Sequence, residues 1–289
     1  MGGFLRRHKR IIPYLLLAPG LLWLAVFYVV PGIQMFVTSL WTGSLETGYE
    51  FALSNVSNYT EALERFAPQF IRSVVYGGAA TILTFAISYP LAYTIAFRGG
   101  RYKNLLLFLV VAPFFTSFLL RTLSWKIILG DTGILFGPLN DAGVLPDEFR
   151  VLATPVAVIF GITYNFLPFM TLPIYVSLEK IDKRLVEAAE DLYASSIGAF
   201  RRITLPLSLP GVFAGSLLTF IPAMGDYVNA ELLGNPETTM IGNVIQNQFL
   251  VQNNYPTASA LSFLLMAGIL IAVLVYARLL GTEELSGGV

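Results

Sequence analysis

The sequence lacks several residue types that common protein functions require. Among its 289 residues there is no cysteine, and His8 is the only histidine. Disulfide bonds and thiolate metal sites are therefore excluded. A single histidine has no second imidazole to help it hold a metal ion. We predict no metal site on this chain.

Charged residues are also scarce. They make up 12% of the chain, about half the fraction found in soluble domains. Eighteen basic and eighteen acidic residues balance to a formal net charge of +0, so the basic face that nucleic acid requires is absent and we expect no nucleic-acid partner. No GxxxxGK[ST] phosphate loop, nucleophilic serine elbow or metal-binding histidine pair is present. We therefore expect no catalytic residues and no cofactor on this chain.

Hydrophobic residues are abundant, at 55% of the chain, and they gather in long runs. A membrane span needs roughly 20 mostly apolar residues. The predicted spans are about 13–40, 71–97, 104–126, 152–178, 207–230 and 257–280. A soluble fold does not need six such segments, because a soluble helix keeps a polar face. We predict an all-α, polytopic membrane protein with six transmembrane helices, forming a single domain over residues 1–289.

The first apolar run follows a basic cluster and could be a signal peptide. It is too long for one, contains three prolines and lacks a clear cleavage site, so we expect a retained span. Basic residues favour cytoplasmic loops. Most of the basic residues fall in the inner segments, and most of the acidic ones in the outer segments, if the N-terminus is cytoplasmic. We therefore expect both termini in the cytoplasm.

The segment 179–206 is the longest predicted cytoplasmic loop. Asp182 can cap a first short helix, which good helix formers extend to Leu192. A turn is expected near Ser195–Gly198, before a second helix. Small residues at Ala188 and Ala189 leave a low surface that another protein could approach closely. From the residues alone, this is an amphipathic loop that could dock a partner.

The same loop resembles a known family. Permease subunits of ATP-binding-cassette importers carry the pattern Glu-Ala-Ala, three residues, Gly, nine residues, Ile-x-Leu-Pro. This chain has Glu187-Ala188-Ala189 and then Ile203-Thr204-Leu205-Pro206 at that spacing. It departs from the pattern at the glycine, which is Tyr193 here, so Gly198 is expected to supply flexibility instead.

Further stretches resemble the spermidine/putrescine importer permeases. They are Ala112–Thr116, Leu167–Met170, Ile174–Asp182, Pro222–Val228, Glu231–Gly234 and Met240–Asn243. The resemblance implies the type I importer permease fold in a bacterial inner membrane. It also implies four kinds of partner: a dimer of ATPase subunits that bind ATP and Mg, a second homologous permease, an extracytoplasmic substrate-binding protein, and membrane lipid.

The resemblance also suggests functional residues. The ATPase-coupling residues are expected to be Glu187, Ala188, Ala189, Leu192 and Gly198. A polyamine needs spaced acceptors for its ammonium groups and aromatic faces for its cationic stem. The expected substrate-pathway residues are Asp226, Tyr227, Glu231, Tyr164, Asn165 and Phe169. For these residues the alternative is ordinary interfacial solvation and an aromatic belt.

Several alternatives remain open from the sequence. Permeases for iron, thiamine, molybdate or sulfate share the loop signature. A secondary carrier or channel is less favoured. A carrier usually keeps acids near the membrane midplane for its coupling ion, and the predicted spans hold almost no ionisable residue. A membrane anchor or assembly factor is a third possibility. The uncharged segment Met240–Asn254 is predicted to form an amphipathic helix, either at the membrane interface or lining a vestibule.

Overall fold

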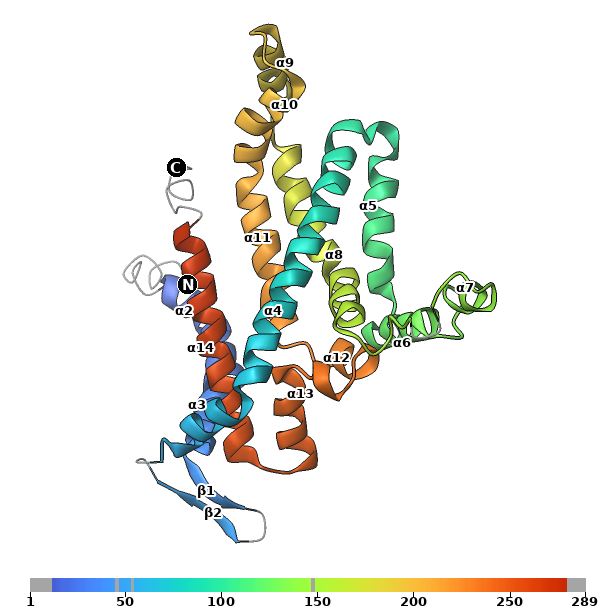
Figure 1. The fold of residues 1–289 in the computed structure, drawn as a ribbon. Coiled ribbons are helices and arrows are strands. Elements are labelled where there is room, and N and C mark those ends of the chain that lie inside the picture. Colours follow the sequence, from blue (N-terminus) through green and yellow to red (C-terminus); the bar gives the residue numbers. More distant parts are fainter. Residues whose placement is uncertain (1–11, 45–46, 53–54, 147–148, 280–289) are drawn as a thin grey trace. The chain divides into compact units, whose positions relative to one another are not determined.

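The structure is a computed structural model that describes residues 12–44, 47–52, 55–146 and 149–279 (Figure 1). The described chain is largely helical, as predicted. The α-helices are α2 (Ile12–Leu24), α3 (Val30–Ser39), α4 (Ser57–Tyr93), α5 (Lys103–Val111), α6 (Phe118–Leu129), α7 (Gly137–Asp141), α8 (Pro155–Glu179), α9 (Lys183–Asp191), α10 (Ser196–Ala199), α11 (Leu205–Met224), α12 (Val228–Leu233), α13 (Ile241–Gln246) and α14 (Tyr255–Leu279).

Short π and 3-10 segments continue or connect these helices. They are η1 (Ala25–Val29), η2 (Thr94–Arg98), η3 (Gly100–Tyr102), η4 (Ala112–Phe115), η5 (Phe200–Thr204), η6 (Pro236–Thr238) and η7 (Asn247–Val251). The predicted amphipathic helix at 240–254 corresponds to α13 and η7. One antiparallel hairpin, β1 (Trp41–Ser44) with β2 (Gly48–Phe51), is an addition that the all-α prediction did not contain.

Five helical segments are long and apolar enough to cross a membrane, or six if a sharply bent pair counts as one span. The five are Tyr14–Ser39, Ser57–Arg98, Pro155–Glu179, Ser196–Met224 and Tyr255–Arg278. The bent pair is Gly100–Phe115 with Phe118–Leu129, at an angle of 93°. The backbone is extended at Thr116, between the two pieces, so the helix cannot continue straight through this point. The fifth predicted span, 207–230, ends earlier in the structure, because α11 ends at Met224.

The described residues form two compact units. The first contains the described residues up to Arg65 together with 247–264. Within it, the Tyr49 hydroxyl at the hairpin donates a hydrogen bond to the Asn253 carbonyl at 2.7 Å. The Phe36 and Phe263 rings meet edge to face at 5.6 Å, so residues distant in sequence hold this unit together.

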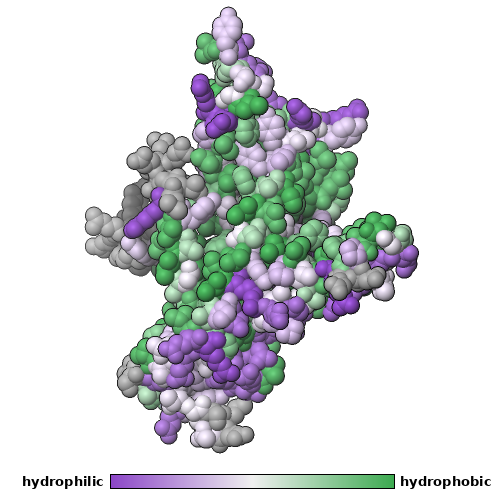
Figure 2. All heavy atoms as spheres, viewed as in Figure 1, coloured by the Kyte–Doolittle hydropathy of each residue, from purple (hydrophilic) through white to green (hydrophobic). Residues whose placement is uncertain are grey.

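The second unit contains 66–246 and the described residues from Leu265 onward, and its core is built on α8 and α11. A Cβ at Gly215 would lie 2.9 Å from the Met170 sulfur, and one at Gly211 would lie 2.5 Å from the Pro173 carbonyl oxygen. These two positions, one turn apart, therefore let the α11 backbone approach α8 closely. Small residues at such contacts are typical of helices that pack inside a membrane. Hydrophobic residues cover the outer surface of α5 (Figure 2).

Candidate functional site

The loop between α8 and α11 is anchored at its base. The Phe200 ring packs edge to face against Tyr89 at 5.8 Å and Tyr93 at 5.9 Å on α4. At the end of α8, Glu179 forms an ion pair with Lys103. The base of the loop is thereby tied both to α4 and to the start of α5.

Beyond this base, α9 lies at the outer end of the loop, next to α10 (Figure 1). The predicted cap forms, because the Asp182 carboxylate accepts a hydrogen bond from the Arg184 backbone N–H at 3.0 Å. None of the residues of α9 is buried. Ser195 caps α10, its hydroxyl accepting a hydrogen bond from the Gly198 N–H at 3.2 Å. Gly198 therefore lies in the first turn of the second helix and not in the turn between the helices.

Apolar side chains cluster at the turn between α9 and α10. Leu192 is 81% exposed, Tyr193 is 99% exposed and Ile197 is 72% exposed. Glu187 and Ala188 are also exposed, whereas Ala189 and Gly198 are half-buried. Large apolar side chains that are exposed outside a core mark a site of contact with a protein, a membrane or a ligand.

Tyr193 occupies the glycine position of the family pattern in the backbone conformation that glycine favours. Its φ is 65°, in the left-handed region. For a residue with a Cβ this conformation costs roughly 1–2 kcal/mol. Its N–H donates to the Glu190 carbonyl at 3.0 Å, which closes the end of α9. The turn thus forms with Tyr193 at the glycine position, while Gly198, expected to supply the flexibility, lies in α10.

A cluster of buried polar side chains joins α6, α8 and α12. Asn229 donates from its side-chain amide to Asp226 Oδ2 at 2.8 Å. The Asn229 amide oxygen therefore faces the other way, where it accepts hydrogen bonds from Asn165 Nδ2 at 3.1 Å and the Thr122 hydroxyl at 3.3 Å. Asp226 in this way orients a polar contact between three helices.

The Asp226 carboxylate is itself buried, just beyond the end of α11. Its Oδ1 accepts a hydrogen bond from the Asn229 backbone N–H at 2.7 Å, at the start of α12. Burial raises the pKa of Asp226 from 3.8 to about 6, although the hydrogen bonds from Asn229 act in the opposite direction. Each oxygen of Asp226 therefore accepts a hydrogen bond from Asn229, which ties the end of α11 to the start of α12.

The structure places the other predicted pathway residues around this cluster. Glu231 is exposed, and its Oε2 accepts a hydrogen bond from Asn243 Nδ2 at 3.2 Å. Tyr227 is 44% exposed. On α8, Tyr164 packs against Trp125 at 5.2 Å, and Phe169 packs against Phe114 at 4.9 Å.

Sequence reasoning missed three members of this region: Arg121, Thr122 and Asn229. Arg121 interrupts an otherwise uncharged apolar run, and an ionisable residue inside a span is usually functional. The sequence therefore contained a signal that could have identified Arg121. Asn229 carried no comparable signal, because its role depends on contacts with helices far away in sequence.

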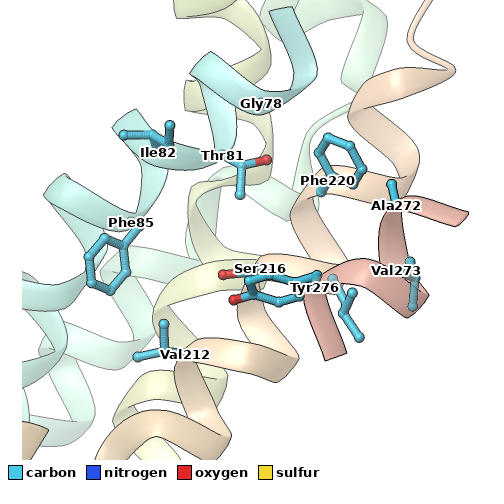
Figure 3. Close-up of a pocket in the computed structure, with 11 residues that line it drawn as sticks. Gly78, Thr81, Ile82, Phe85, Val212, Ser216, Phe220, Ala272, Val273 and Tyr276 are labelled. Carbon is cyan, nitrogen blue, oxygen red and sulfur yellow. The ribbon is translucent and has the colours of Figure 1, made fainter. Parts of the chain in front are cut away.

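A separate cavity of about 410 Å³ lies between α4, α11 and α14 (Figure 3). Its lining is Gly78, Thr81, Ile82, Phe85, Val212, Ser216, Leu217, Phe220, Ala272, Val273 and Tyr276. No charged residue and no predicted pathway residue lines it, so it does not suit a polycation. Across the described ranges, no group of three or more histidine, aspartate or glutamate residues could hold a metal ion.

The chain matches the family of binding-protein-dependent transport system inner membrane components over residues 10–280. It therefore belongs to that family, and it is a multi-pass permease of an inner membrane. The family resemblance seen in the loop signature is confirmed.

The chain is also similar to individual permeases of known bacteria. The chain is 40% identical to the spermidine/putrescine transport system permease protein PotB of Haemophilus influenzae, over 89% of this chain and 90% of that protein. It is 37% identical to PotB of Escherichia coli, over 89% and 93%. It is 30% identical to the inner membrane ABC transporter permease protein YdcU of E. coli, over 98% and 94%.

Solved structures show the same fold. A bacterial ABC transporter that imports the acidic polysaccharide alginate has a chain that matches with a TM-score of 0.75 at 20% identity, covering 95% of this chain and 97% of that one. The MetNI methionine ABC transporter matches with a TM-score of 0.58 at 18% identity, covering 77% and 97%. The ABC importer permease fold is thus confirmed.

Proposed function

We propose that this chain is one permease subunit of an ATP-driven importer, that it forms half of a pathway for polyamines, and that it couples to ATPase subunits through the segment 179–206. The observation that carries the coupling proposal is that α9 has no buried residue and ends in an exposed apolar turn. The family signature, Glu187-Ala188-Ala189, lies on that helix, where Glu187 and Ala188 are exposed and Ala189 is half-buried.

The anchored base and the free tip suit a mechanical link. A partner protein that binds the exposed turn can shift α4 and α11 through the base of the loop. Phe200 at this base packs against α4, and η5 continues directly into α11. ATP and Mg would bind the ATPase subunits, and this chain would catalyse no reaction itself. Closure of the ATPases would shift α4 and α11 and so open the pathway.

The polyamine proposal rests on the relatives named spermidine/putrescine permeases, with 40% identity over most of both chains. The exposed Glu231 offers a carboxylate, and Phe114 with Phe169 offers aromatic faces suited to an ammonium group. A second, homologous permease would complete the pathway, and an extracytoplasmic binding protein would deliver the substrate.

The coupling proposal is tested by Ala188→Asp, which places a charge on the free face of α9. Ala142→Asp is the matched control, because Ala142 is also exposed but lies after α7. Uptake of labelled spermidine is measured in cells with equal amounts of assembled complex. We expect loss of uptake in the first variant and normal uptake in the second. Normal uptake by Ala188→Asp would remove the coupling role.

The substrate proposal is tested by Glu231→Gln, with Glu237→Gln as the control at another exposed acid. Glu231→Gln should lower spermidine uptake while the complex still assembles. Equal uptake by the two variants would remove Glu231 from the pathway. Uptake of neither spermidine nor putrescine by the wild-type complex would overturn the polyamine assignment altogether.

A further inference from the structure

Arg121 on α6 lies in a setting that its own chain does not explain. Its Cζ lies 4.9 Å from the centre of the Phe114 ring and 5.8 Å from that of Phe118. Its Nε and Nη1 atoms are buried and have no hydrogen-bond partner among the described residues. Arg121 as a whole is partly exposed, but burying two guanidinium N–H groups without an acceptor is costly, so the arrangement needs an explanation.

The rings around Arg121 belong to a larger aromatic cluster. Phe114 packs edge to face against Phe169 at 4.9 Å, and Phe166 contacts both Phe118 at 6.4 Å and Phe169 at 5.9 Å. The cluster therefore joins η4, α6 and α8. Aromatic faces attract cations, and they do so more strongly away from water.

A second unpartnered atom lies in the neighbouring polar cluster. Asn165 is 1% exposed, and both of its printed hydrogen bonds are donated by its Nδ2, to Thr122 and Asn229. Its Oδ1 is buried and accepts from no described residue. A buried acceptor next to an aromatic cluster suits an ammonium group, which supplies donors and no acceptors.

We infer that the Arg121 guanidinium occupies a cation site formed by the Phe114 and Phe118 rings. During transport, an ammonium group of the substrate takes the same site. This inference rests on the proposed function, since it requires a cationic substrate. The substrate must displace the guanidinium, so Arg121 lowers the affinity of the resting permease for polyamine. The same positive charge opposes leakage of other cations.

The test uses the whole complex in nanodiscs, without nucleotide and without the binding protein. Binding of labelled spermidine is measured for the wild type, for Arg121→Met and for Arg121→Lys. Methionine keeps an apolar stem without the charge, and lysine keeps the charge. We expect Arg121→Met to bind spermidine roughly three- to tenfold more tightly than the wild type. Arg121→Lys should bind as the wild type does.

Phe114→Leu provides an independent variant if Arg121→Met does not assemble. It removes an aromatic face, so spermidine binding should weaken, and the double variant Phe114→Leu/Arg121→Met should lose the gain of the single one. Unchanged or weaker binding in assembled Arg121→Met, or wild-type binding in Phe114→Leu, overturns the inference. So does loss of the second permease from purified Arg121→Met, because Arg121 would then be an interface residue.

Failure of the proposed function and failure of this inference give different results. If the wild-type complex takes up no spermidine, the proposed function fails and this inference fails with it. If the wild type takes up spermidine normally but Arg121→Met binds it with unchanged affinity, only the role of Arg121 is overturned.

Discussion

The segment 183–198 and the polar cluster around Asn229 use their side chains in opposite ways. In the segment, Leu192, Tyr193 and Ile197 are left without cover. In the cluster, Asn229 is fully buried and bonded to three other side chains. Exposed apolar groups mark a contact site, whereas hydrogen bonds among buried polar groups fix how helices pack. Substitutions in the first region should therefore affect coupling, and those in the second should affect stability.

The largest expected effect is that of Leu192→Asp on transport. A charge at the exposed turn should weaken ATPase docking, since truncation of a central contact residue often costs 2 kcal/mol or more. We expect uptake of labelled spermidine to fall by about tenfold or more, with an unchanged melting temperature of the isolated permease. Leu139→Asp, at a partly exposed position on α7, is the control. A fall in melting temperature specific to Leu192→Asp would contradict the contrast between the two regions.

Asn229→Ala should lower the stability of the fold. It removes the side-chain hydrogen bonds that Asn229 makes with Asp226 Oδ2 and with Asn165 Nδ2, at a cost of about 1–3 kcal/mol. The permease should melt at a lower temperature in thermal unfolding in detergent. Asn140→Ala removes only an exposed hydrogen bond to the Asp131 carbonyl, so it should leave the melting temperature nearly unchanged. Equal melting of the two variants would mean that the cluster does not stabilise the fold.

The buried Asp226 carboxylate predicts a pH dependence. Its pKa in the folded state is raised from 3.8 to about 6, so the folded protein binds this proton more readily than the unfolded chain does. The stabilisation is therefore full below about pH 4 and is lost as the pH rises through 6. The wild type should lose on the order of 2–3 kcal/mol across this window relative to Asp226→Asn. Parallel unfolding profiles for the two proteins would contradict this.

The smallest expected effect concerns the left-handed Tyr193. Tyr193→Gly removes the Cβ strain and should stabilise the turn by roughly 1 kcal/mol at most, after allowance for glycine's greater freedom in the unfolded chain. Tyr193→Ala keeps the strain and should bring no such gain. Hydrogen exchange of the Tyr193 amide, which donates to Glu190, reports the difference. Faster exchange in Tyr193→Gly than in Tyr193→Ala would argue against strain.

The sequence predicted the features that depend on local pattern. Apolar runs indicated the spans, and Asp182 was identified as a helix cap because its side chain needs only the next two residues. The Glu187-Ala188-Ala189 signature identified the family. These features rely on neighbouring residues, so hydropathy, spacing and capping rules detect them.

The features that were not predicted depend on tertiary contacts. The 93° bend before α6 follows from extended backbone at Thr116, which no hydropathy pattern specifies. Asp226 was predicted as a pathway acid, and the pattern did not reveal that Asn229 donates hydrogen bonds to both of its oxygens. The contact of Arg121 with Phe114 was not predictable for the same reason, since Phe114 lies across the bend from α6, whereas Phe118 is one turn away on α6 itself.

The most direct test of the central claim is ATP-driven uptake by a reconstituted complex. The permease is incorporated into proteoliposomes with its ATPase subunits, second permease and binding protein, and labelled spermidine inside the vesicles is measured with and without ATP. We predict accumulation that requires ATP and that Ala188→Asp abolishes. Accumulation without ATP, or undiminished accumulation with Ala188→Asp, would contradict it.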